Sequence, residues 1–268
     1  MDWQKLSPVL LRHVQLFKWG VLAAWAVAWV GAVFNWWRWS SSWLPLMALT
    51  AVAFLALKVW AGWRRERLIR EAALPQFLKR KLRTQFPHLS GKDADLVERG
   101  LRQFFMACNR CPSKFVAMPS KVVDAMWHEF ILHTHGYANW CELALGRFLH
   151  HTPAEALGTL PQRNDGLRRA WYWACKDESI DPRHPTRLPL LFALDAKLGI
   201  EGGYHYVPNC NDIARKSDSN GNGSSSYCAT SFSDGSASGD GDGFGGEASS
   251  GEGGSDSGGD GGGGCGGD

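Results

Sequence analysis

The sequence predicts an all-α membrane protein in three parts: a two-helix transmembrane hairpin, a small all-α cytoplasmic domain and a disordered glycine-rich tail. Two apolar runs without charges lie next to each other near the N-terminus. The middle of the chain shows helical periodicity with helix caps and no sustained alternation of apolar and polar residues. The end of the chain is dominated by Gly, Ser and Asp.

The two apolar runs follow an N-terminal segment, residues 1–18. Residues 19–37 and 39–57 each hold 19 consecutive residues without a charge. A helix of that length spans about 28 Å, close to the hydrocarbon core of a bilayer, and a helix satisfies its own backbone there. Lys58 can snorkel to the interface, which extends the second span to 39–63. Tryptophans gather at the ends of both runs, as they do at membrane interfaces.

The basic residues predict the orientation of this hairpin. Only Arg38 lies in its turn, whereas three bases precede the first span and eight follow the second. The positive-inside rule therefore places both termini in the cytoplasm of a multi-pass protein of the inner (plasma) membrane, where we expect no structural disulfide. Two alternatives stay open: a buried helical hairpin of a soluble protein, and a signal peptide cleaved near Ala28.

Charge is divided unevenly along the chain. Residues 211–268 hold two basic and ten acidic side chains, a net charge of −8, which leaves +11 for residues 1–210 of the overall +3. Residues 64–86 form a predicted basic juxtamembrane helix, and its bases from Arg64 to Arg83 point to anionic lipid headgroups as partners. Nucleic acid is the less favoured partner, because this helix emerges directly from a span.

Residues 87–208 form the predicted cytoplasmic domain. Ser90 followed by Asp93 is typical of a capping box, and Ser120 is a second N-cap. Gly146 fits a helix C-cap. Further helices are expected from Thr152, over 165–176 and over 189–198.

Candidate chemistry gathers between residues 108 and 151. Asp124 and His128 are four residues apart and therefore lie on one helix face. A carboxylate beside an imidazole is typical of a metal-binding or catalytic histidine. His128 begins a sequence similar to HExxH, but the next histidine is His133, five residues on, so a zincin site is not expected. The candidate zinc ligands are Cys108, Cys111, His128, Cys141, His150 and His151.

Three interpretations of these residues stay open. The first is structural: Cys108, Cys141 and Cys175 are small buried residues, and Asp124 and His128 brace neighbouring backbone. The second is metal binding, with zinc as the candidate ion. The third is catalysis, with His128, Cys141 and Asp124 as candidate catalytic residues.

Several blocks resemble the bacterial branch of the glycine-rich domain-containing protein-like family. The blocks are Met118–Leu132 with Tyr137 and Cys141, Gly146–Pro153 and Leu188–Asp195. The likeness covers residues 87–208, and the glycine-rich tail with Cys265 also fits. It implies that Asp124, Trp127, His128, Cys141, His150 and His151 are marked positions, without assigning them roles. Plant relatives suggest stress and RNA-related functions through domains that this chain lacks, so these functions are not carried over.

The tail, residues 209–268, is predicted to be disordered, because its composition offers too little apolar surface to offset the entropy of ordering. The sequence then favours a membrane-anchored protein that presents an all-α binding or scaffold domain to a cytoplasmic protein. The alternative is a membrane-tethered metal- or thiol-dependent hydrolase built on His128, Cys141 and the His150-His151 pair. Transport is disfavoured, because neither span carries an internal ionisable residue.

Overall fold

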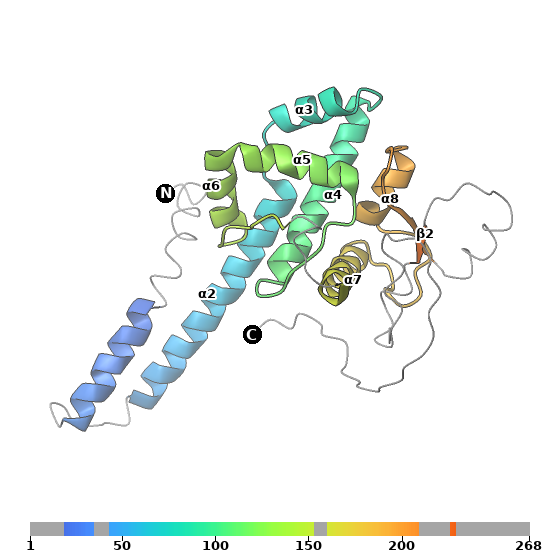
Figure 1. The fold of residues 1–268 in the computed structure, drawn as a ribbon. Coiled ribbons are helices and arrows are strands. Elements are labelled where there is room, and N and C mark those ends of the chain that lie inside the picture. Colours follow the sequence, from blue (N-terminus) through green and yellow to red (C-terminus); the bar gives the residue numbers. More distant parts are fainter. Residues whose placement is uncertain (1–18, 35–42, 153–159, 209–225, 229–268) are drawn as a thin grey trace. The chain divides into compact units, whose positions relative to one another are not determined.

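A computed structural model describes residues 19–34, 43–152, 160–208 and 226–228. These residues are mostly helical (Figure 1), which confirms the predicted all-α class apart from one short pair of strands. The chain divides into two compact units. The first comprises residues 1–72 and 138–149, and the second comprises residues 73–137 and 150–268.

The first unit contains an apolar helix, Trp19–Val33, and the long helix α2, Trp43–Glu71. We predicted that the second span ends at residue 63 and that a separate basic helix follows. Instead, α2 continues through the arginines after Trp63 as one helix. The first proline after the apolar run is Pro75, so nothing in the sequence breaks the helix earlier. The remaining part of this unit is the segment 138–149, which includes most of α6, Thr134–Ala144.

Within the described residues, α2 is the one helix that is long and apolar enough to cross a membrane by length and composition. The helix Trp19–Val33 has about half the length of α2 and would span about 22 Å. The end of the predicted first span, residues 35–37, lies outside the described residues. The structure therefore shows one candidate membrane helix and not the predicted two-helix hairpin.

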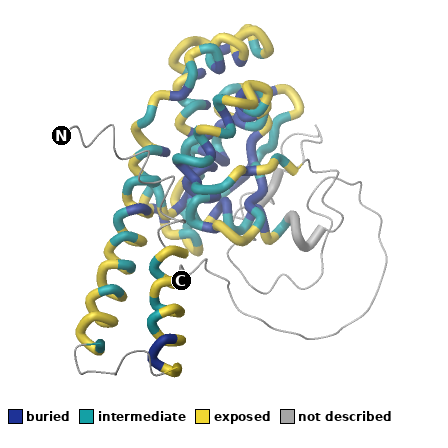
Figure 2. Tube along the Cα trace, turned by 90° about the vertical axis from the view of Figure 1, so that its left-hand side faces the viewer, coloured by how far each residue is buried: buried dark blue, intermediate teal, exposed yellow. Residues whose placement is uncertain are grey.

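The second unit is built around α4, Gly91–Arg110, which packs against four other helices. These are α3 (Phe77–Gln85), α5 (Lys121–Leu132), α7 (Leu160–Asp177) and α8 (Leu190–Lys197). Figure 2 shows most buried residues within these helices, whereas the two apolar helices of the first unit are mostly exposed. The ring of Trp127 lies 4.9 Å from that of Phe104 between centroids, and the rings of Phe192 and Trp171 are 5.1 Å apart. These aromatic pairs join the helices into one hydrophobic core.

The predicted caps are confirmed where the structure describes them. Ser90 and Asp93 form a reciprocal capping box at the start of α4. The hydroxyl of Ser120 accepts a hydrogen bond from the Val123 N–H at the start of α5. Gly146 has a left-handed φ of 69° after α6, as expected of a C-cap glycine. The helix expected from Thr152 falls largely on residues 153–159, outside the described residues.

Residues 226–228, the part of the tail that the structure describes, form a strand. β2, Ser226–Cys228, pairs in parallel with β1, His205–Val207, and places Tyr206 opposite Tyr227. The prediction of a disordered tail is wrong for this segment. A strand of three residues is too short to show an alternating pattern of apolar and polar residues in the sequence. Backbone pairing with a distant strand supplies the order.

Asp195 is the central polar residue of the second unit. This residue of α8 is only 1% exposed, and its carboxylate accepts four hydrogen bonds. The donors are the Ser120 hydroxyl at 2.7 Å, the Lys121 N–H at 2.7 Å, the Val122 N–H at 3.1 Å and the Tyr204 N–H at 2.9 Å. Three of them belong to the start of α5, where backbone N–H groups have no partner within the helix. A residue of α8 thereby fixes the beginning of α5.

Glu178 fixes the beginning of α8, as Asp195 fixes the beginning of α5. Its carboxylate accepts the Leu190 N–H at 2.5 Å and the Gln103 amide at 3.0 Å, and it pairs with Arg187. The other end of the Gln103 amide accepts the Leu191 N–H at 2.9 Å. Burial alone would raise the pKa of Glu178, but the hydrogen bonds from Leu190, Gln103 and Arg187 outweigh it, so that the pKa lies below its ordinary value of 4.5.

Replacing Asp195 should destabilise the second unit strongly. In Asp195→Ala, the buried donors at the start of α5 lose their acceptor, which should lower the free energy of unfolding by about 3 kcal/mol. Denaturant unfolding of the full chain measures this value. Lys197→Ala, an exposed change on the same helix, is the control and should lower it by less than about 0.5 kcal/mol. Equal stability of the two variants would contradict the role given to Asp195.

Acid should weaken the fold through Glu178. Because its pKa is lowered on folding, its contribution is present above pH 4.5 and is lost as the pH falls through the lower, folded-state pKa. Glu178→Gln should lower stability at pH 7 by about 1–2 kcal/mol and flatten the loss below pH 4.5. Unfolding curves recorded across this range, with exposed Glu201→Gln as the control, test the prediction. Parallel pH profiles for wild type and Glu178→Gln would refute it.

Candidate metal site

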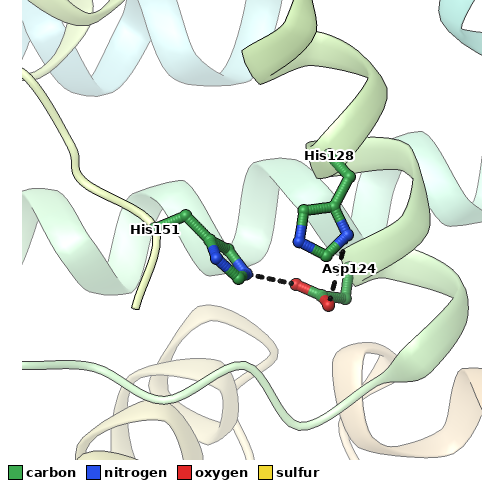
Figure 3. Close-up of side chains that lie close together, drawn as sticks. All are labelled: Asp124, His128 and His151. Atoms are coloured by element: carbon green, nitrogen blue, oxygen red, sulfur yellow. Dashed lines mark hydrogen bonds and ion pairs between the residues drawn. The ribbon is translucent and has the colours of Figure 1, made fainter. Parts of the chain in front are cut away.

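Asp124 and His128 lie on the same face of α5, as their spacing predicted (Figure 3). The distance between His128 Nδ1 and Asp124 Oδ2 is 3.6 Å. Asp124 is in the first turn of α5, just after the Ser120 cap and the backbone groups held by Asp195. The interactions that fix the start of α5 therefore also fix the backbone that carries Asp124.

His151 approaches the same carboxylate from the segment that follows residue 149. Its Nε2 lies 3.2 Å from Asp124 Oδ1, and Figure 3 shows both histidine rings beside the Asp124 carboxylate. The His128 and His151 rings are 4.3 Å apart between centroids. The ring of Trp127 contacts His151 at 4.9 Å, edge to face, and its indole N–H donates to the Tyr137 hydroxyl at 3.1 Å. Trp127 thus supports His151 from the buried side.

The three side chains offer one carboxylate and two imidazoles to a common point. Their ligand atoms all lie within 4.8 Å of one another. Ligands about 2.1 Å from a zinc ion would lie roughly 3.4 Å apart in a tetrahedral site, so the group must contract slightly to hold an ion. The side chain of His128 is 50% exposed, whereas that of His151 is 19% exposed. Solvent reaches the group from the His128 side.

The other predicted ligands do not belong to this group. Cys111 is disulfide-bonded and accepts a hydrogen bond from the Trp173 indole at 3.1 Å, so it offers no thiolate. The disulfide at Cys111 also contradicts the expectation that the chain has no structural disulfide. Cys108 is buried within α4, and His150 is exposed. Cys141 is completely buried and lies in the other unit, in its segment 138–149.

Cys175 shows how burial affects a thiol in this domain. It is fully buried on α7, and desolvation, with smaller contributions from Glu178 and Asp181, raises its pKa to about 12. A thiol with such a pKa is protonated at neutral pH and is not nucleophilic. The structural interpretation of the buried cysteines therefore fits Cys175.

Asp195, Glu178 and Gln103 are the residues of the site's framework to which the sequence analysis gave no role. Each of them forms hydrogen bonds with partners more than 70 residues away in the sequence. The helix start that Glu178 and Gln103 hold also has no capping motif in the sequence. The available signal was Asp195 itself, an acidic residue within the apolar block Leu190–Leu198. An acid in such a position requires buried partners.

The fold and the site define the class of protein: an all-α domain that is joined to an apolar helix and carries a surface cluster of two histidines and one carboxylate. Comparison with known proteins adds the family. Residues 64–232 match the model of the UCP032817-like family, which covers more than half of the chain, and the chain belongs to this family. The matched region starts directly after the apolar part of α2 and ends just beyond β2. No curated protein and no solved structure matches the chain.

Proposed function

We propose that this chain is a membrane-anchored protein whose cytoplasmic all-α domain binds a divalent metal ion through Asp124, His128 and His151. The observation that carries the proposal is the convergence of three ligand atoms, from two separate segments, within 4.8 Å. Two imidazoles and one carboxylate suit zinc, iron or manganese rather than calcium or magnesium. Zinc remains the first candidate.

The membrane anchor is supported by the exposure of α2. Only 6% of its most apolar window is buried, and large side chains such as Leu44, Leu49 and Val59 are exposed. The core helix of a soluble protein would bury these groups, whereas a helix in lipid exposes them to acyl chains. The apolar part of α2, residues 43–63, would span about 31 Å, the thickness of a hydrocarbon core. The Trp19–Val33 helix is the proposed partner span of a hairpin.

The role of the domain follows from how the metal would be held. Three protein ligands leave coordination positions open, and the half-exposed His128 places them toward solvent. Such an ion can bind a group of a cytoplasmic partner protein, which is the scaffold role proposed from the sequence. It can also activate water for hydrolysis, which is the second candidate function. The thiol-dependent version is not proposed further, because Cys141 is completely buried.

The likeness to the glycine-rich domain-containing protein-like family remains part of this proposal. Three of its marked positions, Asp124, His128 and His151, form the cluster, and a fourth, Trp127, contacts it. A shared metal-binding role for that block is the interpretation that follows.

Metal analysis of the full chain tests the proposed function. The purified protein should contain about one equivalent of zinc or another transition metal, and His151→Ala and Asp124→Ala should each weaken binding at least about tenfold. His184→Ala is the matched control, because His184 lies 3.3 Å from Asp181 and no third ligand joins this pair in the part of the chain that the structure describes. Its metal content should equal that of wild type.

A structural role of the cluster gives a different result. His151 and Asp124 would then only join the segment after residue 149 to α5. In that case neither zinc nor cobalt binds to the wild type, while His151→Ala still lowers the melting temperature. This combination would overturn the metal proposal.

The topology of the anchor can be measured separately. A green fluorescent protein fused to the C-terminus should fluoresce, and an alkaline phosphatase fused there should be inactive, because the distribution of basic residues favours a cytoplasmic C-terminus. An active phosphatase would overturn the orientation. It would also agree with the disulfide at Cys111, which is unusual in a reducing compartment.

A further inference from the structure

Arg65 is a half-buried cation whose position calls for an anion. It lies on α2, two residues after Trp63, where the apolar part of the helix ends. Its Nε is enclosed by protein and has no hydrogen-bond acceptor. Among the described residues, Arg65 takes part in no hydrogen bond or ion pair. The side chain as a whole is only half-buried, so the rest of the guanidinium can still meet a ligand from solvent. A buried N–H donor without an acceptor is costly, so a ligand that supplies an acceptor is expected to bind there.

The position of the Arg65 guanidinium is set by Gly146. A Cβ atom at residue 146 would overlap the guanidinium, so the group occupies the space that the absent side chain leaves. Gly146 also has a φ of 69°, which other residues rarely adopt. Its N–H donates to the carbonyls of Cys141 and Glu142, which closes the end of α6. Arg147 follows directly, and its Nε is also enclosed.

A cap for the end of α6 is the simplest alternative role for Arg65. A cation near a helix C-terminus is favourable when it hydrogen-bonds the last carbonyls. Arg65 makes no such bond, while Gly146 and Leu145 donate their N–H groups to the carbonyl of Cys141. Capping therefore does not account for the buried Nε of Arg65.

The depth of Arg65 in the proposed membrane points to phosphate. Trp63 is 56% exposed, as suits an interfacial tryptophan, and the Arg67 guanidinium lies 5.5 Å from its ring centre. Arg65 lies about 3 Å further along the helix axis, at the level of the headgroups. The planar guanidinium fork binds two oxygens of a phosphate group at once.

We propose that Arg65, with Arg147 beside Gly146, binds the phosphate group of an anionic phospholipid at the cytoplasmic surface of the membrane. The proposal rests on the membrane anchor proposed above and is independent of the metal. It differs from general attraction between the basic stretch and an anionic surface, in which each base contributes about fivefold in affinity wherever it lies. A built site should make Arg65 far more important than an exposed neighbour.

Lipid titration of the full chain tests this difference. Binding of phosphatidylglycerol is measured by native mass spectrometry on protein in neutral detergent, for wild type, Arg65→Gln and Arg83→Gln. Both variants remove one charge, but Arg83 is exposed on α3. Arg83→Gln should weaken binding by up to about fivefold, and Arg65→Gln by about 50-fold, because it also loses charge-assisted hydrogen bonds. Equal losses in the two variants would overturn the site.

Two further variants separate geometry from charge. Gly146→Ala keeps every charge but displaces the Arg65 guanidinium, and should weaken binding about tenfold. Arg65→Lys keeps the charge but loses the fork, and should not restore wild-type affinity. Wild-type affinity in both would refute the proposal, even if Arg65→Gln failed to fold.

Free inorganic phosphate could occupy the same site, because it presents the same oxygens as the phosphate group of a lipid. Excess inorganic phosphate should not displace the lipid from the wild-type protein if the lipid is the ligand. Displacement by phosphate that depends on Arg65 would overturn the assignment to a lipid. Failure of the anchor itself is recognised separately, because the wild-type chain would then not remain with neutral phosphatidylcholine vesicles.

Discussion

The arrangement of the second unit depends on a buried carboxylate, that of Asp195. A carboxylate removed from water must be neutralised by hydrogen bonds, and here the donors are backbone groups at the start of α5, which equally need an acceptor. The same arrangement is repeated one step earlier, where Glu178 and Gln103 hold the start of α8. The helices are thus joined in series: Gln103 of α4 and Glu178, which follows α7, hold α8. α8 in turn holds α5, and α5 carries Asp124 and His128. The candidate metal site has a rigid base although one of its histidines is half exposed.

The two units perform physically different tasks. In the first, exposed apolar side chains on α2 suit a lipid environment, and arginines begin as soon as that surface ends. In the second, aromatic rings form a hydrophobic core, and the candidate metal ligands gather in one surface cluster. The proposed functions divide in the same way, with phosphate recognition in the first unit and metal binding in the second. An anchored domain of this kind would keep its metal and any partner close to the membrane surface.

Much of the local structure could be predicted from the residues themselves. The caps at Ser90, Ser120 and Gly146 form through bonds to residues within five positions, so the nearby sequence contains each cap. The additional bond from Ser120 to Asp195 is not visible in that nearby sequence. The pairing of Asp124 with His128 follows from helical periodicity. His151 could only be named among six candidate ligands, because it is 23 residues from His128 and no local rule states which histidine returns to α5. The strand β2 was missed for the same reason, since its pairing with β1 joins parts of the chain that are distant in sequence. The disulfide at Cys111 was missed as well.

The sequence by itself determined the all-α class, the apolar helix at the N-terminal side, the helix caps and one face of the candidate site. These features arise from composition and from contacts between near neighbours. Only the tertiary structure decided which of the candidate ligands converge, that Asp195 and Glu178 hold helices α5 and α8, and that Arg65 lies against Gly146. The reason is that a buried charge is stable only with specific partners, and packing rather than sequence spacing brings those partners together.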